Sequence, residues 1–202
     1  MPQEVTVFIV DDDEEVRDAL QLLMQSIGLH SKTYDSAQSY LDHFDASIPG
    51  CLVLDVRMKG MSGLALQSHL ASFDLHPPII IITGHGDISM AVQAVQAGAV
   101  DFLEKPFNEQ TLLESIYRAI EMDAKQRGEA SKTAEIQERI ARLTQREKEV
   151  MEEVVAGKRN KVIAYDLNIS QSTVEAHRAK VMEKMEASSL SDLMRMIFSV
   201  KT

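Results

Sequence analysis

The sequence predicts an α/β domain followed by a smaller all-α domain, and three observations support this division. Up to about residue 122, short apolar runs alternate with segments in which apolar residues recur at helical spacing. From residue 143 onward only helical segments follow. Charge changes at the same place: residues 1–121 carry a net charge of −12, from 6 Lys and Arg against 18 Asp and Glu, whereas residues 143–202 carry +1, from 10 against 9.

Four apolar runs of the first domain are expected to form strands that end at polar residues. The runs are Val5 to Val10, before Asp11-Asp12-Asp13; Cys51 to Leu54, before Asp55; Ile79 to Ile82, before Thr83; and Val100 to Leu103, followed by Lys105-Pro106. The carboxyl ends of parallel strands lie at one edge of a sheet. The polar side chains should therefore meet there.

These side chains are the parts that phosphorylation of a carboxylate needs. An aspartate is the nucleophile, further acidic residues hold Mg²⁺, and the metal and a lysine neutralise phosphoryl oxygens, while a hydroxyl bonds the product phosphate. An acidic triplet alone is more often a solvated helix start, and Asp13 fits that role. The combination predicts Asp55 as a phosphoacceptor.

Segments of helical spacing separate these strands. The first set is Val16, Leu20, Leu23 and Ile27, and shorter sets are Leu66, Leu70 and Phe73, and Leu113, Ile116 and Ile120. Gly28 and Gly98 are suited to end helices. Strand and helix alternate five times, which predicts a parallel sheet with helices on both faces.

Together with Asp-Val-Arg-Met-Lys-Gly-Met-Ser-Gly at 55–63, these residues resemble the receiver domain of two-component response regulators over about residues 4–122. The resemblance implies a (βα)5 fold with strand order 2-1-3-4-5 and a site at its topological switch point. It implies that Asp55 accepts a phosphoryl group from a sensor histidine kinase. Asp12, Asp55 and the backbone carbonyl of Arg57 would bind Mg²⁺, with Asp11 helping directly or through water.

The same resemblance assigns a switch. Thr83 and Lys105 would contact the phosphate, the Lys105-Pro106 peptide would be cis, and Phe102 would change rotamer, with a plain core role as the alternative. Val92 and Gln96 are expected on the dimer surface that phosphorylation creates. Lys59 departs from the family, which usually has Pro there, so phosphate lifetime or kinase choice should differ. His85 is left out of the catalytic set.

Residues 123–142 predict a partly helical linker. The segment is polar, and Gly128 and Ser131 interrupt it before Ile136, Ile140 and Leu143 resume helical spacing. This apolar pattern spans far fewer than the three or four heptads that would favour a coiled coil over a simple linker.

Residues 143–202 predict four helices that include a helix-turn-helix. Thr144-Gln-Arg-Glu147 is a capping box, and Gly157 should end the first helix. A second should run from about Asn160 to Leu167. Ser170 should cap a third, with Val174, Val181 and Met185 buried, and Ser189 a fourth. A short helix, a tight turn and a longer helix with polar exposed residues form this motif.

The stretches Leu143-Thr-Gln-Arg-Glu, Asn160-Lys-Val-Ile-Ala-Tyr-Asp-Leu-Asn-Ile-Ser and Ser172-Thr-Val-Glu-Ala-His-Arg-Ala-Lys-Val-Met resemble the LuxR-type DNA-binding domain. With the receiver, the whole chain resembles the FixJ branch of the NarL/FixJ family. The resemblance implies that the helix from Ser170 enters the major groove. Nearest the base edges would be Thr173, Glu175, Ala176, Arg178 and Ala179, whereas Lys158, Lys161, His177 and Lys180 are better placed for phosphates.

Composition excludes several other classes. No apolar stretch approaches the roughly 18 residues of a membrane span, and no basic segment followed by an apolar one opens the chain, so we expect a soluble, cytoplasmic protein. Cys51 is the single cysteine, which excludes an internal disulfide. The overall charge of −10 does not exclude DNA binding, because a local basic face is sufficient.

We therefore expect a phosphorylation-controlled, DNA-binding transcription activator rather than an enzyme. Its partners would be a sensor histidine kinase, promoter DNA, RNA polymerase and a second copy of the chain. One alternative is a Mg²⁺-dependent phosphatase with an aspartyl-phosphate intermediate, although Arg57 stands where one such family has an Asp. The other is a receiver that binds proteins without binding DNA.

Overall fold

The computed structural model describes residues 4–73, 75–84 and 88–200. The chain divides into two compact units, Met1–Arg127 and Gly128–Thr202. The first unit has two hydrophobic cores and the second unit has one, and the long helix α5 (Glu109–Ala141) contributes residues to both units.

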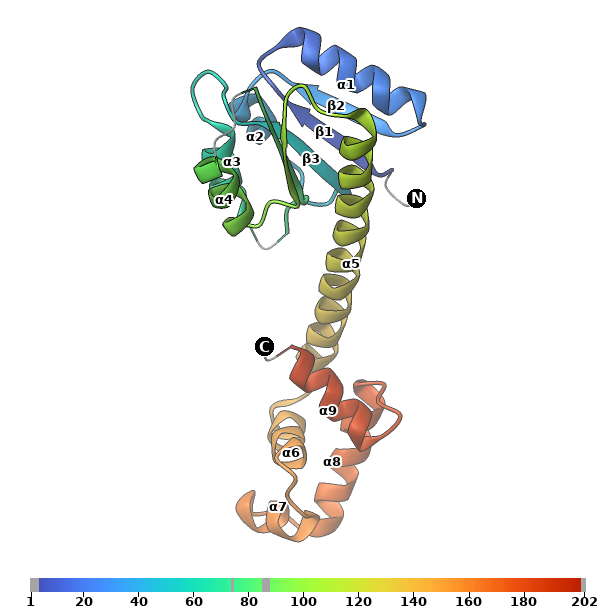
Figure 1. The fold of residues 1–202 in the computed structure, drawn as a ribbon. Coiled ribbons are helices and arrows are strands. Elements are labelled where there is room, and N and C mark those ends of the chain that lie inside the picture. Colours follow the sequence, from blue (N-terminus) through green and yellow to red (C-terminus); the bar gives the residue numbers. More distant parts are fainter. Residues whose placement is uncertain (1–3, 74, 85–87, 201–202) are drawn as a thin grey trace. The chain divides into compact units, whose positions relative to one another are not determined.

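The first unit contains a parallel sheet in the order β2-β1-β3-β4-β5, which confirms the predicted order. Figure 1 labels its neighbouring strands β2, β1 and β3. Its strands are β1 (Thr6–Val10), β2 (His30–Tyr34), β3 (Gly50–Asp55), β4 (Ile79–Thr83) and β5 (Asp101–Glu104). Both faces are covered, which explains why the central strands are continuous apolar runs. The edge strand β2 is largely polar and has no such run, so the sequence did not identify it.

Alternate residues of the central strands enter two different cores. Phe8, Leu52 and Ile81 face the helices α2 (Ala37–Asp42), α3 (Gly63–Leu70) and α4 (Ile88–Gln96). Ile9 and Val53 face α1 (Glu14–Ser26) and the first half of α5. This alternation fixes the register of the sheet and places all carboxyl strand ends at one edge.

Helix ends follow the predicted signals. Asp13 caps α1 by accepting a hydrogen bond from the amide of Glu15. Gly28 and Gly98 follow α1 and α4 with φ of 73° and 87°, a region that glycine adopts without a Cβ penalty. Phe73 does not continue the apolar face of α3, because that helix ends at Leu70.

Helix α5 corrects the prediction of a partly helical linker at residues 123–142. Every residue from 123 to 141 is helical, including Gly128 and Ser131. A glycine inside a helix costs only about 1 kcal/mol relative to alanine, which good helix formers on either side can offset. Ile136 and Ile140, near the end of the helix, also pack against the core of the second unit.

Asp123 and Arg127 attach α5 to the loop before β3. The Asp123 carboxylate, in a residue only 1% exposed, accepts hydrogen bonds from the Gly50 amide at 2.8 Å and from Arg127 Nε at 2.7 Å. Arg127 also donates to the carbonyls of Ala46 and Ile48, at 2.7 and 2.8 Å, and to that of Ser47 at 3.3 Å. The compact part of the first unit therefore extends past residue 122.

The second unit packs α6 (Gln145–Val155), α7 (Asn160–Asp166), α8 (Gln171–Lys184) and α9 (Leu190–Ser199) around one core (Figure 1). The capping box of Thr144 and Glu147 is present, and Ser170 and Ser189 cap α8 and α9 as predicted. Asn168, with φ of 54°, forms the turn between α7 and α8. The helix-turn-helix predicted from the sequence is confirmed.

In the described part of the chain, no helix combines the length and the apolar character that crossing a bilayer requires.

Candidate functional site

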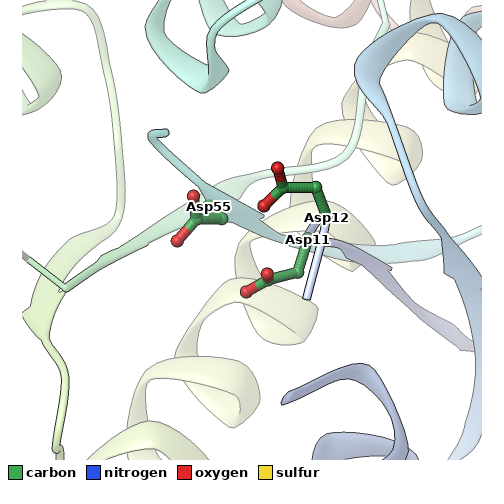
Figure 2. Close-up of side chains that lie close together, drawn as sticks. All are labelled: Asp11, Asp12 and Asp55. Atoms are coloured by element: carbon green, nitrogen blue, oxygen red, sulfur yellow. The ribbon is translucent and has the colours of Figure 1, made fainter. Parts of the chain in front are cut away.

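Three carboxylates converge at the carboxyl edge of the sheet. Asp11 and Asp12 follow β1, and Asp55 ends the neighbouring strand β3. One oxygen from each lies within 4.8 Å of the others, and Figure 2 shows the three side chains gathered at the strand ends. Asp11 and Asp55 are buried, at 1% and 5% exposure, whereas Asp12 is open to solvent. The cluster is therefore approached from the Asp12 side.

Lys105 links two of these carboxylates. Its Nζ lies 2.5 Å from Asp11 Oδ2 and 2.8 Å from Asp55 Oδ1. Burial raises the pKa of Asp11 above its ordinary value, although the hydrogen bond from Lys105 acts in the opposite direction. Burial alone would lower the pKa of Lys105, but the hydrogen bonds to both carboxylates hold that pKa above its ordinary value. The ammonium thus stays charged beside the predicted nucleophile.

Two hydrogen bonds from backbone amides hold Asp55 and the loop that follows it. The Arg57 amide donates to Asp55 Oδ2 at 2.6 Å, and the Gly63 amide donates to the Val56 carbonyl at 3.0 Å. A Cβ at Gly63 would lie 2.1 Å from the Asp55 carbonyl oxygen, so only glycine allows this approach. Asp55 is consequently held by the strand on one side and by this loop on the other.

The predicted switch residues lie on, or directly after, the next two strands of the sheet, β4 and β5. Thr83 ends β4 and is fully buried, and its carbonyl accepts a hydrogen bond from the Lys105 amide at 2.7 Å. The Lys105-Pro106 peptide is cis, as predicted. Phe102 on β5 is half-buried against the core that α4 covers. His85 lies outside the described residues.

This donor set fits Mg²⁺, which binds carboxylate oxygens and usually retains several waters. Asp11, Asp12 and Asp55 each offer an oxygen, and the exposure of Asp12 leaves room for water. When bound, the ion would neutralise negative charge on phosphoryl oxygens. Among the described residues, this is the only group of acidic, histidine or cysteine side chains with metal-ligand spacing.

Helix α4 exposes the apolar face that was predicted for dimerisation. Ile88, Val92 and Val95 are 85%, 49% and 57% exposed, and Gln96 is exposed beside them. Because α4 contacts the core through Ala94 and Met90, its outer face is available to a partner.

In the second unit, most predicted DNA contacts lie on the outer side of α7 and α8. The exposed residues of this set are Lys158, Lys161, Glu175, Ala176, Ala179 and Lys180, and Thr173 is partly covered. Lys158 is paired with Glu153 and Asp166, which raises its pKa, because Asp166 and Glu153 accept hydrogen bonds from its ammonium. Lys161 forms no ion pair with any residue of the described segments.

Two predicted contacts have inward-facing atoms. Arg178 Nη1 donates to Asn160 Oδ1 at 2.7 Å, and its side chain lines a small cavity with Val150 and Met151. His177 Nδ1 is buried and has no hydrogen-bond partner in the described part of the chain. The sequence reasoning did not single out Asn160, because an asparagine in a first helical turn carries no distinctive pattern.

Comparisons with known proteins agree with both units. Residues 7–117 match the family model described as a response regulator receiver domain. Residues 141–197 match the model of bacterial regulatory proteins of the luxR family. The two matches together cover most of the chain.

Similar proteins share this organisation over nearly their full length. The transcriptional regulatory protein FixJ of Azorhizobium caulinodans is 45% identical over 97% of this chain and 93% of its own. The response regulator protein TodT of Pseudomonas putida is 45% identical over 96% of this chain and 86% of its own. A solved structure of the response regulator StyR is 41% identical, with a TM-score of 0.86, over 96% of this chain and 98% of its own.

Proposed function

We propose that this chain, which belongs to the response regulators that join a receiver domain to a LuxR-type DNA-binding domain, is controlled by phosphorylation of Asp55. The chain is a phosphorylation-controlled, DNA-binding regulator of transcription. Its relatives are named transcriptional regulators, so the chain is a regulator rather than a phosphatase. The single observation that carries the assignment to Asp55 is the convergence of the Asp11, Asp12 and Asp55 carboxylates, with Lys105 Nζ hydrogen-bonded to Asp11 and Asp55.

In the proposed reaction an oxygen of Asp55 forms a bond to the phosphorus of a phosphohistidine on a sensor kinase. The phosphorus–nitrogen bond of the donor breaks, and the imidazole leaves with the electron pair and takes up a proton. Lys105, already charged and hydrogen-bonded to Asp55, would neutralise the negative charge of one phosphoryl oxygen. Asp11 and Asp12 would hold Mg²⁺ with Asp55 and the carbonyl of Arg57.

The phosphate would then shift neighbouring groups. Asp55 pairs in register with Ile82, one residue before Thr83, so a hydroxyl on β4 is close enough to follow the new charge. Movement of Thr83 would allow Phe102 to repack beside α4. The exposed face of α4 with Val92 and Gln96 would then pair with that of a second copy.

Pairing of receivers would bring two helix-turn-helix units to the two half-sites of a promoter, and the bound dimer would activate RNA polymerase. Thr173, Glu175, Ala176 and Ala179 would lie nearest the base edges, and Lys158, Lys161, His177 and Lys180 nearest the phosphates. We assign residues 1–122 to the receiver, 123–142 to a helical linker whose first residues pack on the receiver, and 143–202 to the DNA-binding domain.

The experiment is phosphorylation of the full chain by acetyl phosphate with Mg²⁺, followed by intact mass spectrometry and by DNA selection from a random duplex library. Asp55→Asn removes the nucleophile at nearly constant volume, and Asp13→Asn is the matched control because Asp13 only caps α1. We expect the native chain and Asp13→Asn to gain one phosphoryl group and to enrich a two-fold symmetric sequence. Labelling of Asp55→Asn at the native level would contradict the assignment.

A further inference from the structure

Arg178 lies on the buried face of α8 rather than on its outer face. It follows Val174 by four residues and precedes Val181 by three, and both valines are buried. Residues at these spacings share one face of a helix. The exposed side of α8 instead carries Ala176, Ala179 and Lys180.

Arg178 lies between three neighbouring helices. Its side chain lines a cavity with Met151 of α6 and Leu193 of α9. Its Nη1 donates to Asn160 Oδ1, at the first residue of α7, over 2.7 Å. Within the described segments, no carboxylate forms an ion pair with Arg178, so the hydrogen bond to Asn160 is the contact that orients its guanidinium.

Helix α7 needs such an external contact. It has only seven residues, and its N-cap residue Arg159 makes no side-chain capping hydrogen bond. A helix this short is not stable in isolation and depends on tertiary contacts. Ile163 and Ala164 hold its buried side, while the bond from Arg178 holds its first turn.

We propose that Arg178 and Asn160 form a positioning pair, which fixes the start of α7 against α8 and so sets how the recognition helix is presented to DNA. In this role Arg178 does not read a base. The proposal rests on the proposed function, because it concerns DNA binding by the same helix-turn-helix. It revises the role of Arg178 that the family resemblance implied.

The two roles predict different DNA-binding data. Loss of a residue that reads a base relaxes sequence preference at one position of each half-site. Loss of a positioning pair weakens binding but leaves the preferred sequence unchanged. Two partners of one contact should also be coupled, so the double variant loses little more than either single variant.

The test uses the full chain phosphorylated with acetyl phosphate and Mg²⁺. Arg178→Met keeps an apolar stem, Asn160→Ala removes the acceptor, and Asn160→Asp keeps an acceptor oxygen. Lys180→Met is the control for loss of charge: Lys180 is exposed on α8, is proposed to contact phosphate and makes no hydrogen bond to Asn160, so this variant should weaken binding but leave α7 unchanged. Each variant is measured by selection from a random duplex library and by fluorescence anisotropy on the duplex that the native chain selects.

We expect Arg178→Met and Asn160→Ala each to weaken DNA binding about tenfold. The double variant should bind only slightly more weakly than either single variant. All three variants should keep the native sequence preference. Asn160→Asp should bind like the native chain. Without DNA, hydrogen exchange at residues 160–167 should rise in Arg178→Met and Asn160→Ala but not in Lys180→Met. This readout distinguishes positioning from a simple loss of charge.

Relaxed preference at one base pair in Arg178→Met, with native binding by Asn160→Ala, would overturn the proposal. Native affinity and exchange in both variants would overturn it as well. If Arg178→Met does not fold, Asn160→Ala and Asn160→Asp decide the question by themselves. A phosphorylated native chain that selects no DNA sequence would overturn the proposed function and this inference together, an outcome distinct from the others.

Discussion

Replacement of Arg127 by methionine should strongly destabilise the first unit, although residue 127 is far along the chain from the core strands. The native guanidinium pairs with Asp123 at 2.7 Å and donates to carbonyls of the loop before β3. Methionine keeps the apolar stem but removes every donor. The Asp123 carboxylate would then keep only the Gly50 amide as a partner.

The expected cost follows from burial. The Asp123 side chain is 2% exposed and that of Arg127 17%, so this pair is largely removed from water. Removing one partner of a buried pair costs about 3 to 5 kcal/mol, because the other charge remains buried without compensation. Because Arg127 is partly exposed, we expect the loss to lie at the lower end of this range, about 3 kcal/mol. Such a loss is a large fraction of the stability of an ordinary domain.

Hydrogen exchange of peptides from residues 46–54 in the full chain would measure this loss, because it reports opening of the first unit without contribution from the second. Arg118→Met is the matched control. The Arg118–Asp101 pair has the same chemistry, but its side chains are 55% and 31% exposed, so its removal should cost less than about 1 kcal/mol.

A double variant tests the cause. Asp123→Asn removes the buried charge but keeps an oxygen for the Gly50 amide, so adding it to Arg127→Met should recover about 1 to 2 kcal/mol. The reasoning is wrong if Arg127→Met costs no more than Arg118→Met. It is also wrong if the double variant is less stable than Arg127→Met alone.

Three further predictions concern other parts of the chain. Lys105→Ala should accept phosphate from acetyl phosphate yet fail to dimerise in analytical ultracentrifugation, and native dimerisation would remove Lys105 from the switch. Gly63→Ala should destabilise the receiver by about 1 to 3 kcal/mol, because its Cβ would meet the Asp55 carbonyl, whereas Gly128→Ala, with open space, should be neutral or stabilising in thermal unfolding. The hydrogen bond from Lys184 lowers the pKa of Glu147 from 4.5 to about 2, so stability from this pair is complete above pH 4.5 and is lost as the pH falls toward 2. Unfolding of Lys184→Met should therefore differ from the native chain at pH 6 and converge with it near pH 2, and an equal difference at both values would contradict the pairing.

The central strands could be predicted because both faces of the sheet are covered. Burial on both sides demands continuous apolar runs such as Ile79 to Ile82, and such runs are visible in a sequence. Strand β2 could not be found this way, because His30–Tyr34 lies at the sheet edge and needs few apolar residues. Edge position is a property of the assembled sheet, which no local pattern records.

The candidate site could be predicted as a set of residues but not as a set of contacts. Strand ends and parallel topology indicate that Asp11, Asp55 and Lys105 meet. The reach of one ammonium to both carboxylates depends on side-chain rotamers, which the spacing of residues does not determine. Arg178 is a different case: its spacing from Val174 already indicates an inward face, but its charge and its place in the recognition helix favoured a DNA contact.

The helical content of residues 123–142 is higher than local composition predicts, because tertiary contacts stabilise the helix. Gly128 and the polar residues around it favour a break in the helix. The contacts of Asp123 and Arg127 on one side, and of Ile136 and Ile140 on the other, hold the helix on both sides of that glycine. A fragment that ends at residue 122 would lose both members of the Asp123–Arg127 pair.

The hydrogen bond between Gly63 and Val56 allows the surface of the loop after Asp55 and the position of Asp55 itself to vary independently. Residues 57–62 leave the end of β3 and α3 begins beside that end, because the Gly63 amide donates a hydrogen bond to the Val56 carbonyl. Arg57 and Lys59 are exposed on this loop, while Asp55 stays buried beneath it. We therefore expect substitutions at Arg57 and Lys59 to change how long a phosphoryl group persists, or which kinase delivers it, without displacing Asp55, the proposed phosphoacceptor.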